Sequence, residues 1–175
     1  MSFKSAMILR SVGAQDRTRL RDWRNQDFIR QASLTDHKIT VDEHNAWFDN
    51  ILSRDDGVWC VAELHGKPVG HVNAVMQDGG TWQWSFYIGD QNAPKGTGAA
   101  MLTLFLAELF SRDGVQAIAA QTVASNAASR HLHEKLGFVV TGEADDVLDL
   151  SLSRARWQDS QAIYDACLSR VLKGE

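Results

Sequence analysis

Apolar and polar residues along the chain follow two different rhythms, which separate candidate strands from candidate helices. Branched, aromatic and other apolar residues occur at alternating or consecutive positions, as in β-strands, in stretches 5–12, 58–65, 68–76, 81–88, 115–123, 138–141 and 147–152. Apolar residues recur every three or four positions, as in amphipathic helices, in stretches 14–28, 41–52, 97–110, 127–136 and 158–172. The pattern predicts the order strand, two helices, three strands, helix, strand, helix, two strands and helix.

Capping and turn residues set several boundaries of these elements. Thr40 and Glu43 form the sequence of a capping box, which predicts a helix start at residue 41, with Trp47, Ile51 and Leu52 on one face of the helix. Gly66-Lys67 predicts a two-residue turn that joins the second and third strands in a hairpin. Because another glycine turn follows, three consecutive antiparallel strands are expected.

The order of elements also favours one parallel connection. A strand, a tight glycine loop, a helix and another strand follow each other over residues 81–123, as in a parallel β-α-β unit. This unit is attached to the antiparallel hairpin strands. The chain is therefore predicted to be a mixed α/β (α+β) protein and not a doubly wound one.

Composition narrows the class of protein. A length of 175 residues, with 44% hydrophobic and 23% charged residues, is ordinary for a single globular domain, expected to span 1–175. The net charge of -4 argues against a nucleic-acid-binding surface. No apolar run approaches the ~18 residues of a membrane span, and no signal peptide is visible, so a cytoplasmic location is expected. Cys60 and Cys167 form no metal or redox motif and are expected to be buried, reduced thiols, and no metal is predicted.

A glycine loop before the longest apolar helix is the first candidate site. The two glycines let the backbone approach a ligand, and the helix start adds unpaired N–H groups that suit a pyrophosphate. Met101 stands where a dinucleotide-binding fingerprint needs a third glycine, and the lysine precedes its glycine, unlike in a Walker loop. Alone, the pattern fits a plain strand-to-helix turn equally well. The residues of this loop are Lys95, Gly96, Thr97, Gly98, Ala99 and Ala100.

A second motif lies one strand further along. Asn126 opens a short helix that ends in Lys-Leu-Gly-Phe at 135–138. A phosphate loop followed at this distance by such a helix resembles the GNAT superfamily of acetyltransferases, over about residues 58–142. Two positions depart from the family pattern: Ala93 replaces an arginine or glutamine before the loop, and His133 replaces a tyrosine before the final motif.

The resemblance implies a GNAT-type acyl-CoA N-acyltransferase fold, with a mixed, mostly antiparallel central sheet and helices on both faces. It also implies that acetyl-CoA lies between two splayed strands. The pantetheine arm would hydrogen-bond to the strand before the loop, through Phe86, Tyr87 and Ile88, with Asn126 on the opposite side. No metal is implied.

The implied reaction is direct transfer of the acetyl group to an amine that has lost its proton. A backbone N–H near Tyr87 would stabilise the oxyanion. His133 is the candidate proton donor to the departing thiolate, although it also fits a surface helical histidine. The general base is open, because residues 81–85 contain no carboxylate. His71, Ser85 or an ordered water could serve, whereas His65 and His71 also fit exposed positions flanking the hairpin.

The N-terminal third carries a finer resemblance. Trp-Arg-Asn at 23–25 and Glu-His-Asn-Ala-Trp at 43–47 are similar to the N-acetyltransferases of pseudaminic acid biosynthesis, which acetylate the 4-amino group of a UDP-linked amino-dideoxy sugar. Arg30 and Lys38 would add charge for a diphosphate, and Trp82 an aromatic face. The resemblance implies an acceptor site that contains Arg24, Asn25, His44, Trp47 and Trp84.

Other acceptors and one different class of protein stay open. Ribosomal-protein acetyltransferases share the Trp-Arg-Asn part, so a peptide or protein N-terminus is an alternative acceptor, as is another small amine. A non-catalytic CoA-binding module is the alternative outside the enzymes, supported by the missing carboxylate base. A homodimer is possible because exposed strands in such sheets often pair.

Overall fold

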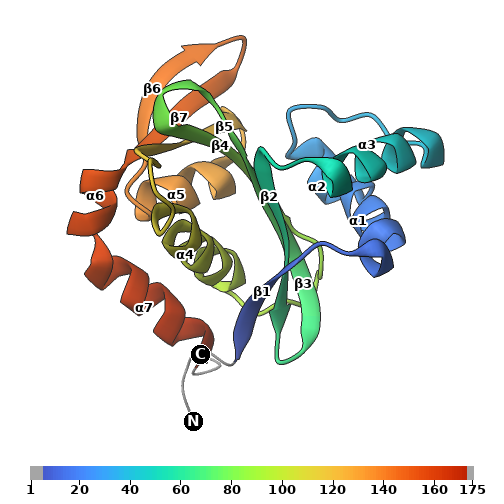
Figure 1. Ribbon diagram of the computed structural model, residues 1–175, viewed down its shortest axis with the longest axis horizontal. Helices are drawn as coiled ribbons and strands as arrows, with labels where there is room; N and C mark the ends of the chain where they lie inside the picture. Colours follow the sequence, from blue (N-terminus) through green and yellow to red (C-terminus); the bar gives the residue numbers. More distant parts are fainter. Residues whose placement is uncertain (1–5, 173–175) are drawn as a thin grey trace.

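The computed structural model describes residues 6–172, which build one mixed sheet flanked by helices (Figure 1). The sheet has seven strands in the order β1-β2-β3-β4-β5-β7-β6. The strands are β1 (Met7–Ser11), β2 (Gly57–Leu64), β3 (Lys67–Met76), β4 (Thr81–Ile88), β5 (Ala117–Val123), β6 (Val139–Ala144) and β7 (Val147–Ser153). The helices are α1 (Arg17–Arg24), α2 (Asp27–Gln31), α3 (Val41–Ser53), α4 (Thr97–Phe110), α5 (Ala127–Lys135), α6 (Arg154–Asp159) and α7 (Gln161–Leu172).

The pairing of the strands confirms the predicted mixed topology. Strands β1 to β4 pair antiparallel in chain order, β5 pairs antiparallel with β7, and β7 pairs antiparallel with β6. Only β4 and β5 are parallel, with α4 as their connection, which is the predicted β-α-β unit. Position 5, expected at the start of the first strand, lies outside the described residues.

The parallel strands β4 and β5 separate after a short common stretch. They pair only where Thr81–Gln83 meets Ala117–Ala119. Beyond this point, β4 still pairs with β3 as far as Ile88, whereas no strand described between residues 6 and 172 pairs with its other side. The sheet therefore opens between the two strands, as the resemblance implied.

Helices cover both faces of the sheet (Figure 1). On one face, α4, α5 and α7 bury the larger apolar cluster, whose centre includes Met101, Phe105 and Ile118. On the other face, α1 and α3 bury a smaller cluster around Leu20, Phe48 and Val61, next to the half-buried Trp23. Alternating residues of β2 and β3 thus contribute to two separate layers, whereas the apolar residues of β4 in these clusters belong to the larger one.

The capping box of α3 is confirmed, but the face of this helix was predicted wrongly. Thr40 Oγ1 accepts a hydrogen bond from the N–H of Glu43, whose carboxylate accepts one from the N–H of Thr40. The buried residues are His44, Phe48 and Ile51, at i, i+4 and i+7. Trp47 and Leu52 are 39% and 49% exposed, because their positions lie to either side of that stripe.

Two further boundaries differ from the expectation. The hairpin turn is His65-Gly66, one residue earlier than predicted, because both residues have positive φ (51° and 77°), as a type I′ turn requires. The N-terminal helical stretch is divided into a short 3₁₀ turn, α1 and α2, and the C-terminal one into α6 and α7. Cys60 and Cys167 are buried free thiols, as expected.

Candidate active site

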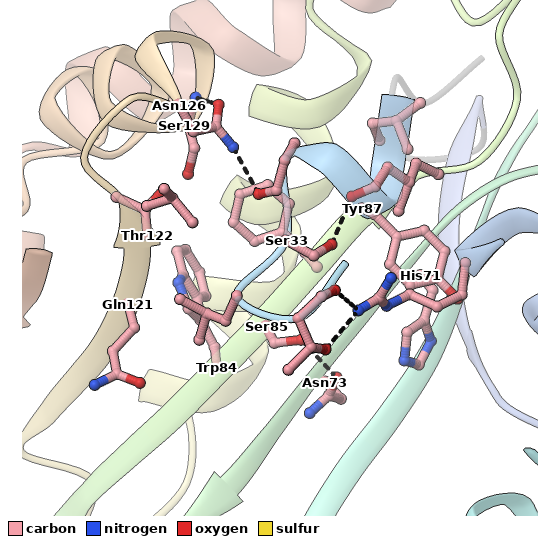
Figure 2. Close-up of a pocket in the computed structure, with 18 of the residues that line it drawn as sticks. Ser33, His71, Asn73, Trp84, Ser85, Tyr87, Gln121, Thr122, Asn126 and Ser129 are labelled. Carbon is pink, nitrogen blue, oxygen red and sulfur yellow. Dashed lines mark hydrogen bonds between the residues drawn. The ribbon is translucent and has the colours of Figure 1, made fainter. Parts of the chain in front are cut away.

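A cavity of about 750 Å³ lies where β4 and β5 separate, and Figure 2 shows part of its wall. Its floor comes from β3, β4 and β5, and α5 forms one side. Residues of α1, α2, α3 and the segment 32–39 close the other side. The cavity therefore joins the expected cofactor cleft to the face of the sheet that carries α1 and α3.

The glycine loop forms the start of α4, as predicted. Gly96 precedes the first helical residue with a φ of 91°, a conformation that only glycine adopts easily. The hydroxyl of Thr97 donates to the carbonyl oxygen of Pro94 (2.7 Å), so this side chain caps the loop and does not point outward. Ala99 and Ala100 are buried against the core. What the loop offers a ligand is the backbone N–H groups at a helix N-terminus.

The end of β4 contributes backbone on one side and side chains on two faces. Phe86 and Ile88 pack against the larger apolar cluster, whereas Tyr87 faces α1 and donates to the carbonyl oxygen of Leu20 (3.3 Å). Since β5 has already separated, the cleft side of this backbone has no neighbouring strand. An extended ligand can therefore hydrogen-bond there in the manner of an added strand.

Asn126 lies across the cleft at the N-terminus of α5 (Figure 2). Its Oδ1 accepts a hydrogen bond from the N–H of Ser129 (3.0 Å), which is a helix N-cap. Its Nδ2 donates to the carbonyl oxygen of Ala32 (3.0 Å) in the segment after α2. Asn126 therefore connects α5 to the segment that covers the cavity.

His133 is buried, with only 1% of its surface exposed, and both ring nitrogens are engaged. Its Nδ1–H donates to the carbonyl oxygen of Ser129 (2.8 Å), and its Nε2 accepts from the indole N–H of Trp84 (3.1 Å). Burial lowers the pKa of His133, so the ring is neutral. No ring N–H is left for a departing thiolate, and the geometry does not support the expected proton-donor role.

Trp84 also lines the cavity, but from the face of the sheet opposite to α1 and α3 (Figure 2). It is 2% exposed and stacks on Phe138, with 4.9 Å between the ring centroids. Side chains alternate along a strand, so Trp84 shares the face of Phe86, while Ser85 and Tyr87 point to the opposite one. Trp84 therefore belongs to the core beneath α5.

His71 on β3 is the most distinctive polar group of the wall (Figure 2). It is 2% exposed, which corrects the expectation of an exposed histidine, and its ring lies 5.4 Å from that of Tyr87. Its Nδ1–H donates to the carbonyl oxygen of Cys60 (2.9 Å), whereas its buried Nε2 has no partner in hydrogen-bond geometry among residues 6–172. The side chain of Asn73 acts on the ring from nearby and opposes the effect of burial on its pKa. Burial lowers the pKa of His71 to about 4. His71 therefore presents a neutral nitrogen lone pair.

Ser85 lies on the same face as His71, beside Asn73 (Figure 2). Its hydroxyl is exposed and donates a long hydrogen bond of 3.4 Å to Oδ1 of Asn73. No charged group near it would make its oxygen a base. Of the two predicted side-chain candidates for the base, the structure gives His71 the better-defined geometry.

The residues predicted to bind the acceptor divide into two groups. Arg24, His44, Trp47 and Trp84 line the cavity, whereas Asn25 does not. Asn25 instead makes two 2.8 Å hydrogen bonds to the backbone of Ile39, and the Nε2–H of His44 donates to a backbone carbonyl of α1 (2.6 Å). Asn25 and His44 therefore hold α1, α3 and the intervening segment together. Asn25 is absent from the described cavity wall, whereas His44 is part of it and stays a predicted contact with substrate.

The side chains expected to add charge or an aromatic face are also engaged elsewhere. Arg30 pairs with Asp27 and donates to the carbonyl oxygen of Asp36. Lys38 lies at a separate surface hollow, and Trp82 is buried in the core. The sequence did not indicate the segment 32–39 as a cavity wall, because this segment has no regular secondary structure and no motif.

Comparison with known proteins assigns this arrangement to a family. Residues 6–139 match the acetyltransferase (GNAT) domain. The chain belongs to the GNAT acetyltransferase family. This GNAT acetyltransferase is 26% identical over 126 residues to the L-methionine sulfoximine/L-methionine sulfone acetyltransferase of Pseudomonas aeruginosa, which covers 69% of this chain and 71% of the relative.

Solved structures share the fold of this GNAT acetyltransferase. The aminoglycoside acetyltransferase AAC(6')-Ib, in complex with coenzyme A and kanamycin, aligns with a TM-score of 0.77 at 19% identity, over 89% of this chain and 99% of that one. Spermidine N-acetyltransferase from Vibrio cholerae, with CoA and spermine, aligns with a TM-score of 0.79 at 18% identity, over 88% and 99% of the two chains.

As a GNAT acetyltransferase, the chain is an enzyme that transfers acetyl groups from acetyl-CoA to amines. The residues present fit this cofactor, because the Gly96 loop offers backbone donors for the pyrophosphate and β4 offers an unpaired edge for the pantetheine arm. Between residues 6 and 172, no group of three or more metal-ligating side chains is assembled. In the same part of the chain, no helix is long and apolar enough to cross a membrane.

Proposed function

We propose that this GNAT acetyltransferase transfers the acetyl group directly to the primary amine of a small molecule that binds in the cavity beside His71. The observation that carries the proposal is the buried Nε2 of His71, a residue of the cavity wall, which has no hydrogen-bond partner within residues 6–172. A buried acceptor without a partner is costly unless a ligand provides the donor. An N–H of the acceptor amine is such a donor.

The chemistry fits a neutral His71. The amine reaches the site deprotonated and donates one N–H to Nε2 of His71. This hydrogen bond directs the lone pair of the amine nitrogen at the thioester carbonyl carbon. As the C–N bond forms, the nitrogen becomes far more acidic, so that even an imidazole with a pKa of about 4 accepts its proton. The C–S bond then breaks, the thiolate of CoA takes a proton from water, and the imidazolium of His71 releases its proton to the hydroxide that remains.

A small acceptor agrees with the free groups of the cavity better than a nucleotide does. A UDP-linked amino sugar needs cations for its diphosphate, but Arg30 and Lys38 do not line the cavity. The relatives named above act on or bind methionine sulfoximine, kanamycin and spermine, all of which carry amines. The UDP-amino sugar and a peptide N-terminus remain alternative acceptors that the same assay tests.

The test is release of the CoA thiol from acetyl-CoA in the presence of amino acids, polyamines, aminoglycosides, an N-terminal peptide and a UDP-4-amino sugar. His71→Phe is expected to lower kcat at least 10-fold while the KM for acetyl-CoA stays within about 3-fold. Ser85→Ala is the matched variant on the neighbouring strand and is expected to change kcat little. Loss of activity in Ser85→Ala with full activity in His71→Phe would overturn the role of His71. Absence of turnover with every amine would overturn the proposed function.

A further inference from the structure

Arg24 is an unusual arginine because part of its guanidinium is buried without a counter-ion. Its Nη2 donates to the backbone carbonyl (2.8 Å) and the hydroxyl (3.1 Å) of Thr35, whereas its buried Nη1 has no partner in the part of the chain that the structure describes. No carboxylate lies within ion-pair distance of Arg24 among residues 6–172. Nearby arginines differ, since Arg17 pairs with Asp49 and Arg30 with Asp27.

The side chain of Arg24 lines the cavity. Five side chains in the described part of the chain have a buried polar atom without a partner, and of these only Arg24 and His71 line the cavity. Arg24 is also the only arginine or lysine in the lining described between residues 6 and 172. Tyr87 lies near both residues. Its ring centroid is 5.4 Å from that of His71. Burial raises the pKa of the Tyr87 hydroxyl, and the positive charge of Arg24 partly opposes this effect.

The one carboxylate of the lining does not neutralise Arg24. The carboxylate of Glu43 accepts a hydrogen bond from the N–H of Thr40 (2.8 Å) and lies 3.3 Å from Nε2 of His37. These contacts hold it at the N-terminus of α3. A guanidinium is always charged, and a buried charge without a partner is destabilising. Arg24 therefore places a positive charge at the cavity wall, where an anionic group of a ligand would be stabilised.

We infer that the acceptor carries a carboxylate on the same molecule as the amine, with Arg24 binding the carboxylate and His71 facing the amine. This inference rests on the proposed function and defines the class of its substrate. Arginine binds a compact carboxylate through charge-assisted hydrogen bonds. A single free guanidinium suits one carboxylate and not the two charges of a diphosphate.

The remaining wall describes the rest of the acceptor. Phe28, Leu34 and Trp47 line the cavity and are all well exposed for apolar residues. They suit an apolar or weakly polar side chain rather than a polycation. The expected acceptors are therefore α-amino acids and close analogues with an uncharged side chain.

The experiment compares matched pairs of acceptors that differ only in the carboxylate. L-Leucine, L-phenylalanine and L-methionine sulfone are each assayed beside their carboxamides, by CoA release and by quenching of tryptophan fluorescence in the CoA-loaded enzyme. Arg24→Gln is expected to weaken kcat/KM and binding of the acids roughly 10- to 100-fold, the usual worth of a hydrogen bond to a charged group. The carboxamides are expected to change less than about 3-fold. Arg24→Lys is expected to recover only part of the loss, because it cannot reproduce the guanidinium geometry.

Arg21→Gln is the control, because Arg21 lies on the same helix, pairs with the exposed Asp22 and does not line the cavity. It is expected to behave as the wild type. An equal loss for acids and carboxamides in Arg24→Gln would show a structural role only and overturn the inference. Turnover of polyamines or carboxamides without any dependence on Arg24 would overturn it and leave the proposed function standing. Absence of binding of every acid would also overturn it, whereas Arg24-dependent binding without turnover would support the carboxylate site and contradict the proposed function.

Discussion

The indole N–H of Trp84 donates a 3.1 Å hydrogen bond to Nε2 of His133, and this contact joins β4 to α5 beneath the cavity. Both side chains are almost fully buried, so neither can replace the lost partner with water. Trp84→Phe is expected to lower the free energy of unfolding by about 1–3 kcal/mol, measured by urea denaturation.

A double-mutant cycle separates the hydrogen bond from the lost volume. His133→Leu leaves the indole N–H unpaired, whereas the double variant Trp84→Phe/His133→Leu removes both polar partners. The double variant is therefore expected to lose less free energy of unfolding than the sum of the losses of the two single variants. Strictly additive effects would mean that the hydrogen bond contributes nothing. Trp47→Phe, on the exposed side of α3, is the control and is expected to change stability by less than about 0.5 kcal/mol.

The stability of the fold is expected to fall in mild acid because of His71. The pKa of His71 is lowered from 6.5 to about 4 by burial, so the unfolded chain binds a proton between these values that the folded chain does not. The contribution of neutral His71 to the free energy of unfolding is fully present above pH 6.5 and is lost as the pH falls toward 4. The full effect is about 3 kcal/mol, and His71→Gln should lack it.

The measurement is the free energy of unfolding at several pH values for both proteins. The difference between wild type and His71→Gln is informative, because the lowered pKa values of His44 and His133 affect both proteins alike. A parallel pH dependence in the two proteins would show that His71 titrates normally in the fold.

Two glycines of the phosphate loop are expected to respond differently to alanine. Gly96 has a φ of 91°, and an added Cβ would lie 3.3 Å from a methyl group of Val171, so Gly96→Ala should destabilise the protein itself by about 1–2 kcal/mol. At Gly98 an added Cβ would make ordinary contacts, 3.5 Å from Leu132 and 3.8 Å from Ile88. The Gly98→Ala protein should be as stable as the wild type but bind CoA more weakly, because the added methyl group hinders the approach of the pyrophosphate to the backbone.

Thermal denaturation without ligand and calorimetric titration with CoA distinguish these effects. Equal CoA affinity in wild type and Gly98→Ala would place the pyrophosphate away from this loop. Normal stability of Gly96→Ala would show that the loop adapts to a side chain.

The two hydrogen bonds of Asn126 can be separated by two substitutions. Asn126→Asp keeps an N-cap acceptor for Ser129 but loses the donor to Ala32, whereas Asn126→Ala loses both. Asn126→Ala should destabilise the protein by about 1 kcal/mol, and Asn126→Asp by much less. Both should speed proteolysis in the segment 32–39. Cleavage in this segment at the wild-type rate would show that Asn126 does not hold it.

The regular elements were predictable because their patterns are local. The capping box at Thr40 is confirmed and so are the bounds of α4, since a 14-residue helix repeats its apolar signal over several turns. The face of α3 was not predictable from its aromatic residues alone. Trp47 is as apolar as Phe48, and only the packing against α1 decides which of them is buried.

The backbone geometry of the glycine loop was predictable, and the side-chain contacts around the cavity were not. The loop at Gly96 and the capping residue Asn126 stand in motifs whose geometry follows from the local sequence. The roles of His71 and His133 depend on partners distant in the chain, Cys60 for one and Trp84 for the other. No spacing rule predicts which nitrogen of a histidine is engaged, and therefore which histidine keeps a free lone pair.

The early separation of β4 from β5 has a consequence for the lifetime of the protein. Without acetyl-CoA, the backbone of β4 beyond Gln83 has no strand on its cleft side, so its amide hydrogens should exchange with solvent faster than those of β3. A ligand that binds only the folded state raises its stability in proportion to the logarithm of the free ligand concentration. The amount of intact enzyme in a growing cell would then follow the supply of acetyl-CoA, and starvation for the donor would expose the enzyme to proteases.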